Sequence, residues 1–161
     1  MTHSTDPQDT FSALLQSEVE QTQRLFDLLR QEYKILQLTS PDTLEQLTEE
    51  KRQQIEQLET AVSELNRYLV QQGFSPDQHG TQAFLEHLPE NAQARNWWEK
   101  LQTLLENCHK QNLINGAALS LSQRQVSNSL DLLRGVTGAQ KTYGPAGESR
   151  PNHRINSLGM A

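Results

Sequence analysis

The sequence contains a single cysteine and few of the apolar and aromatic residues that fill a globular core. Cys108 has no partner within the 161 residues, so an internal disulfide is excluded, which favours a reducing compartment. Apolar residues make up 34% and aromatic residues 6% of the chain, whereas globular domains carry nearer half apolar residues. The core is therefore expected to be thin, as in long helices packed side by side.

Other absences exclude further classes of protein. No run of about 18 apolar residues occurs, so no membrane-spanning helix and no direct membrane insertion are expected. The segment Met1–Thr10 is polar and acidic, unlike a secretory signal peptide, and we expect a cytoplasmic protein. The net charge of −6, without a cluster of basic residues, argues against nucleic-acid binding.

Residue patterns typical of catalytic sites are also missing. The sequence has no Gly-rich phosphate loop, no paired-cysteine zinc site and no nucleophile elbow, and no two histidines are four residues apart. Cys108 and His109 point about 100° apart on a helix, so they need partners elsewhere to bind one metal ion, and Cys108 falls on an apolar stripe typical of a core. Glu106 and His109 match the Glu-x-x-His spacing of di-iron bundles once, where two matches are needed. We therefore expect a binding protein, without enzymatic activity, metal or cofactor.

The most abundant residues in the sequence are leucine, with 24, and glutamine, with 20, and both favour helices. Asp6 and Pro7 predict the start of a first helix that ends near Leu38, and the segment 40–42 (Ser-Pro-Asp) predicts a second that stops near Gly73. Apolar residues recur at steps of three and four through both segments. Because their connection is short, the two helices are expected to form an antiparallel hairpin.

The rest of the chain predicts one short and one long helix. Ser75, as N-cap, starts a short helix or single turn that Gly80 weakens and that places Phe84, Leu85 and Leu88 against the hairpin. From Pro89 a helix of roughly 45 residues follows, longer than the roughly 30 residues of each hairpin helix, so its end is expected to extend past them. Asn115 and Gly116 interrupt its apolar stripe and weaken the helix at a point where it could bend or melt, and the sequence leaves the continuity of the helix open.

The composition changes after residue 135. The last 26 residues hold four of the eight glycines and carry +2, so residues 1–135 carry −6 − (+2) = −8. The predicted organisation is a helical bundle domain over residues 1–135 and a mobile C-terminal tail over residues 136–161. The fold class is all-α: a long-helix hairpin plus a third long helix in an elongated, coiled-coil-like bundle.

Four further features carry expectations of their own, and three of them have two interpretations. The charged run 48–52 is expected to be a solvated helix face. Trp97 and Trp98 are expected to pack within the chain, one in the core and the other on a flank or beneath the short segment that links the hairpin to the long helix, with a partner surface as the alternative. The resumed stripe of Leu119, Val126, Leu130 and Leu133 is either core or, if uncovered, a partner site. The segment 143–147 (Tyr-Gly-Pro-Ala-Gly) is either a simple turn or a docking motif.

Three segments together resemble the FlgN-type flagellar export chaperones. They are 48–51 (Thr-Glu-Glu-Lys) with 58–59 (Leu-Glu), 112–116 (Asn-Leu-Ile-Asn-Gly) with the stripe that follows, and 143–147 with a basic tail. Their order and spacing match over most of the chain. The stretch between Gly73 and Ala92 and the Trp97-Trp98 pair depart from the pattern.

The resemblance implies a function and partners. Chaperones of this family bind the hook-associated proteins that join the flagellar hook to the filament, prevent their premature assembly, and deliver them to the flagellar type III export apparatus, at its export gate or ATPase complex. Carried over by position, Leu119, Val126, Leu130 and Leu133 are the expected cargo-binding residues, and Tyr143 with Gly144 is expected to dock at the export gate. The alternative is a self-associating coiled-coil scaffold or regulator. The sequence leaves open which junction proteins are bound and the oligomeric state.

Overall fold

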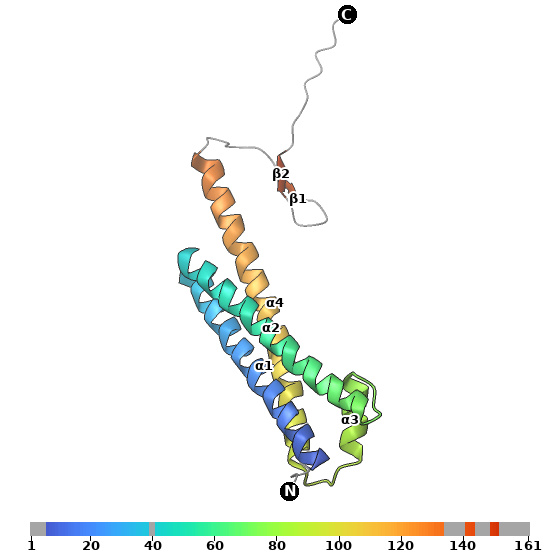
Figure 1. Ribbon diagram of the computed structural model, residues 1–161. Helices are drawn as coiled ribbons and strands as arrows, with labels where there is room; N and C mark the ends of the chain where they lie inside the picture. Colours follow the sequence, from blue (N-terminus) through green and yellow to red (C-terminus); the bar gives the residue numbers. More distant parts are fainter. Residues whose placement is uncertain (1–5, 39–40, 134–140, 144–148, 152–161) are drawn as a thin grey trace, which may run out of the picture. The chain divides into compact units, whose positions relative to one another are not determined.

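The computed structural model describes residues 6–38, 41–133, 141–143 and 149–151 (Figure 1). It contains four helices, α1 (Pro7–Leu38), α2 (Pro41–Gln71), α3 (Gln78–Glu86) and α4 (Gln93–Leu133), and two short strands, β1 (Lys141–Tyr143) and β2 (Ser149–Pro151). Several side chains are outside the description even where the backbone is included, among them those of Val126, Leu130, Leu133 and Tyr143. The chain divides into two units, residues 1–120 and 121–161, each described by itself. The predicted all-α class is confirmed by the four helices.

The hairpin of α1 and α2 has the predicted limits, because local signals fix its ends. The Asp6 carboxylate accepts a hydrogen bond from the Gln8 amide at 3.0 Å, and Pro7 takes the first helical position. The other end is closed at Gly73, whose φ of 84° is the left-handed conformation that glycine favours. There the Phe74 amide donates to the Leu69 carbonyl at 2.9 Å and the Gly73 amide to the Val70 carbonyl at 3.0 Å, the pattern of a Schellman cap. The two helices lie side by side (Figure 1).

The short helix α3 forms as predicted, but its cap is Asp77 and not Ser75. The Asp77 carboxylate accepts from the Gly80 amide at 2.9 Å and from the Ser75 hydroxyl at 2.7 Å. Ser75 therefore supports the cap and does not provide it. Gly80 has a reason that the sequence did not show, because a Cβ at this position would lie 1.7 Å from the Ser75 carbonyl oxygen. Glycine is required there by the close approach of the preceding loop.

The connection from α3 to α4 is held by Arg95. Its guanidinium donates to the carbonyls of Leu85 at 2.7 Å, Leu88 at 2.9 Å and Pro89 at 3.0 Å. These bonds join the end of α3, the segment that follows it and the first turn of α4. This stretch, one of the two departures from the resemblance, is thus a structured turn.

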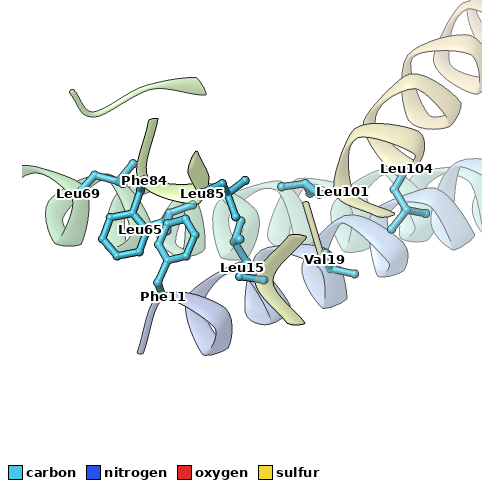
Figure 2. Packing of buried hydrophobic residues seen from close by; sticks show 10 residues of the cluster. Phe11, Leu15, Val19, Leu65, Leu69, Phe84, Leu85, Leu101 and Leu104 are labelled. Carbon is cyan, nitrogen blue, oxygen red and sulfur yellow. The ribbon is translucent and has the colours of Figure 1, made fainter. Parts of the chain in front are cut away.

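The hydrophobic core lies where α1, α2, α3 and the first half of α4 meet (Figure 2). The ring centroids of Phe11 and Phe84 lie 4.2 Å apart, at one end of the cluster in Figure 2, and the rings of Tyr68 and Phe74 lie 6.1 Å and 5.3 Å from that of Phe84. Aliphatic side chains from all four helices complete the cluster: Leu15, Val19, Leu65, Leu69, Leu85, Ala94, Leu101 and Leu104. The thin core expected from the composition is therefore concentrated at the α3 end of the hairpin.

Trp97 and Trp98 are both half-buried against this core. The expectation that both pack within the chain is confirmed, with Trp98 beside Leu85 and Glu86 of α3, although neither side chain is fully enclosed. The Trp97 indole Nε1 is buried and has no hydrogen-bond partner among the described residues, and Lys100 lies 5.7 Å from the ring centroid.

The longest helix, α4, has 41 residues and is longer than α1 with 32 and α2 with 31. It runs through Asn115 and Gly116 as continuous α-helix, which answers the question of continuity that the sequence left open. None of the helices in the described part of the chain is long and apolar enough to cross a membrane.

The sequence predicted no strands, yet β1 and β2 pair antiparallel, with Thr142 opposite Arg150 and Tyr143 opposite Ser149. Thr and Tyr in β1 are residues that strands favour. The division of the chain at residue 135 stays a prediction.

Candidate interaction surfaces

Among the described side chains of α4 beyond residue 110, four large apolar ones are exposed: Leu113 at 61%, Ile114 at 48%, Leu119 at 41% and Leu121 at 57%. Leu119 is one of the predicted cargo-binding residues, and it is exposed in this chain. The side chains of the other three, Val126, Leu130 and Leu133, lie outside the described residues, although their backbone belongs to α4.

These four residues do not share one face of α4. At about 100° per residue, Leu119 lies roughly 160° around the helix from Leu121, and the pair Leu113 and Ile114 falls nearer to Leu121. Leu113, Ile114 and Leu121 were not among the predicted cargo-binding residues, because they lie off the apolar stripe of Leu119. They form a second exposed apolar strip. Its signal in the sequence is the helical spacing of Ile114 and Leu121, which are seven residues apart.

The inward face of α4 is fixed by Asn115, which is only 4% exposed. Its Nδ2 donates to the Leu29 carbonyl at 2.8 Å and to the Glu32 carboxylate at 2.7 Å, and its Oδ1 accepts from Gln111 at 3.0 Å. The residue interpreted as an interruption of the stripe is therefore a buried polar contact between α4 and α1. A hydrogen bond to a charged group contributes about 1.5–3 kcal/mol, so this contact defines how α4 is rotated on the hairpin.

Glu32 also bonds to the second helix, since the Lys51 ammonium lies 2.6 Å from its other carboxylate oxygen. Both side chains are largely buried, with 22% of Lys51 and 13% of Glu32 exposed. We call Lys51, Glu32 and Asn115 the three-helix clamp. It joins two segments of the resemblance, 48–51 and 112–116, and it shows that each supplies a structural residue.

The rest of the charged run is a solvated face, as predicted. Arg52 is exposed and pairs with Glu49 and Glu56 on its own helix. Its hydrogen bonds hold the pKa of Glu49 down at about 2. Exposed pairs of this kind contribute little to stability.

A buried carboxyl group, Glu18, lies on the inward face of α1. Glu18 is 8% exposed, and its Oε2 has no hydrogen-bond partner among the described residues. Burial raises its pKa to about 7. The residue lines a pocket of about 200 Å³, with Val62 and Leu65 of α2 and Trp98 and Leu101 of α4. Glu18 was not among the site residues predicted from the sequence.

Cys108 is 8% exposed, and its thiol lies 3.7 Å from the Thr22 carbonyl, so its prediction as a core residue is confirmed. Burial and the nearby Asp27 raise its pKa. No group of three or more metal-ligating side chains is found within the described ranges.

Tyr143 belongs to β1, and Gly144 lies outside the described residues. Their predicted docking role is not tested by this geometry.

Comparison with known proteins agrees with the resemblance. The family model described as FlgN protein matches residues 8–151, nearly the whole chain. A crystal structure from Pseudomonas aeruginosa, of a protein proposed to be a flagella synthesis protein FlgN, has a TM-score of 0.60 and 25% sequence identity to this chain. The match covers 77% of this chain and 95% of that one. No match was found among curated proteins.

Proposed function

We propose that this chain, which belongs to the FlgN family, binds hook-associated flagellar proteins in the cytoplasm, prevents their premature assembly and delivers them to the export gate. Membership of the family carries a chaperone role in building the flagellum. The observation that supports cargo binding is the exposure of large apolar side chains along α4.

The binding mechanism is helix–helix packing. Leu119, Val126, Leu130 and Leu133 recur at helical spacing, and a cargo helix that is apolar on one face would cover them. Each leucine buried in this way contributes about 1.5–3 kcal/mol before the cost of ordering the partner is subtracted. A cargo helix held like this is unable to associate with other cargo subunits. The chaperone acts by binding alone, without catalysis or a cofactor.

Delivery is assigned to the C-terminal segment. We place export-gate docking at Tyr143 with Gly144, because an aromatic side chain among turn-forming residues is suited to a linear docking motif. Cargo binding and docking then occupy different segments of the chain.

The test is a pull-down of hook-associated proteins from the same bacterium by the tagged chain, followed by calorimetry with each purified protein. The double variant Leu130→Asp, Leu133→Asp is expected to abolish binding, because two charges would be buried against an apolar cargo face. Leu38→Asp is the matched control, since Leu38 is 75% exposed at the end of α1 and is expected to bind normally. Unchanged affinity of the double variant would reject this cargo site.

A further inference from the structure

The pocket at Glu18 has the properties of a binding subsite for a basic side chain. Glu18 is more than nine-tenths buried, yet its Oε2 finds no hydrogen-bond partner among the described residues. A buried carboxyl without a partner costs stability, so such a group calls for an explanation beyond packing. The pocket beside it, about 200 Å³ in volume, offers space for a partner group.

The pocket is lined by apolar, neutral polar and acidic side chains, and by no basic one. Val62 and Leu65 from α2 and Leu101 and Leu105 from α4 form the walls, and Asp77 at the start of α3 is the other ionisable residue that lines the pocket. The remaining lining residues of α2, α3 and α4 are uncharged, and none of the lining is basic. A lysine or arginine side chain, with its apolar stem along the walls and its charged end at Glu18, matches this composition.

The position of the pocket connects it to the proposed cargo surface. Leu105 at its rim is 45% exposed, and Leu119 is 41% exposed. Fourteen residues, or nearly four turns, separate them, so they lie within about 40° of each other around α4 and about 21 Å apart along it. A helix laid along this side of α4 would contact both residues.

We infer that the Glu18 pocket is a second contact for the cargo, and that it receives a lysine or arginine side chain from the helical segment of a hook-associated protein. This inference rests on the proposed function. The apolar stripe supplies affinity, and the pocket supplies specificity, because a helix without a basic side chain at the matching position leaves Glu18 unpaired.

The experiment is calorimetric titration of the full chain with a purified hook-associated protein, at pH 6.5, in two buffers of different ionisation enthalpy. Glu18→Gln keeps the size of the side chain and removes its charge, and it is expected to weaken binding by about tenfold to a hundredfold. Glu20→Gln, on the exposed face of the same helix, is the matched control and is expected to bind like the original chain.

Proton release separates pairing at Glu18 from a merely structural effect. With its pKa near 7, Glu18 is mostly protonated at pH 6.5, and a cation beside it expels this proton. Asp77 does not contribute, because hydrogen bonds from Gly80 and Ser75 hold its pKa low. We expect more than half a proton to be released per complex with the original chain and with Glu20→Gln, and none with Glu18→Gln.

A variant at the rim gives a second, independent measurement. Leu105→Ala is expected to weaken binding severalfold, whereas Val70→Ala, which truncates a side chain that is 56% exposed elsewhere on α2, is expected to have no effect. Binding that is equal in the original chain and in Glu18→Gln, with equal proton release, would overturn this inference and leave the proposed function intact. Absence of any binding by the original chain would overturn both. If Glu18→Gln instead changed only the self-association of the chain, the occupant would be a second copy, which also overturns the inference.

Discussion

Replacing Glu18 with glutamine should change how the stability of the bundle depends on pH. In the folded chain, burial raises the pKa of Glu18 from 4.5 to about 7. The folded state therefore holds this proton where the unfolded state has lost it, and stability falls as the pH rises from about 4.5 through 7. The 2.5-unit difference between these pKa values corresponds to about 3 kcal/mol of destabilisation at alkaline pH.

Most of this cost appears between pH 5 and pH 8, where it grows by about 2.5 kcal/mol. Glu18→Gln has no such ionisation, so its free energy of unfolding should gain about that amount over the original chain across this interval. The cost of burying the glutamine amide of the variant does not depend on pH, so it cancels when the change in stability from pH 5 to pH 8 is compared.

The assay is urea unfolding followed by circular dichroism at pH 5, 6, 7 and 8. Glu20→Gln, exposed on the same helix, should run parallel to the original chain at every pH. A difference between Glu18→Gln and the original chain that stays constant from pH 5 to pH 8 would refute the reasoning, since it would show that Glu18 ionises in the folded chain as freely as in the unfolded one.

Three further predictions concern other parts of the chain. Asn115→Ala should lower the free energy of unfolding, measured in urea, by about 2–3 kcal/mol, because it removes the α4 side of the three-helix clamp. Asn112→Ala, at an exposed position of the same helix, should change it by less than about 0.5 kcal/mol, and equal effects of the two variants would contradict the clamp. Gly80→Ala should lower the thermal midpoint by the equivalent of about 1–3 kcal/mol, because the added Cβ would collide with the Ser75 carbonyl oxygen. Gly116→Ala, with open space around the added Cβ, should stabilise α4 by about 0.5–1 kcal/mol, and an unchanged midpoint for Gly80→Ala would show that the loop at Ser75 moves without cost. Tyr143→Ala should leave the affinity for cargo unchanged in calorimetry and weaken co-purification with the export apparatus; loss of cargo binding would show that the two roles are misplaced.

The helix limits were predictable because they depend on local residues. Asp6 with Pro7, the proline at 41 and Gly73 each act through bonds or backbone angles within a few residues of themselves. The identity of the α3 cap was missed by two residues, since Ser75 and Asp77 both carry cap chemistry and only the approach of the loop to Gly80 selects between them.

The polar contacts of the bundle were not predictable in the same way. Asn115 looked like a break in an apolar stripe, because its partners Leu29 and Glu32 lie more than 80 residues earlier in the chain. Glu18 left a weaker signal, since it follows Leu15 by three residues and precedes Thr22 by four, which is core spacing on α1. Its polarity hid that signal, and only the packed helices show that the residue is buried.

Sedimentation velocity of the purified full chain, alone and mixed with a hook-associated protein of the same bacterium, tests the central claim most directly. The account predicts that mixing produces a faster boundary containing both proteins, and that the Leu130→Asp, Leu133→Asp variant does not form it. A chain that already sediments alone as a large stable oligomer, and whose boundary is unchanged by every hook-associated protein, would contradict the chaperone function and favour a self-associating scaffold.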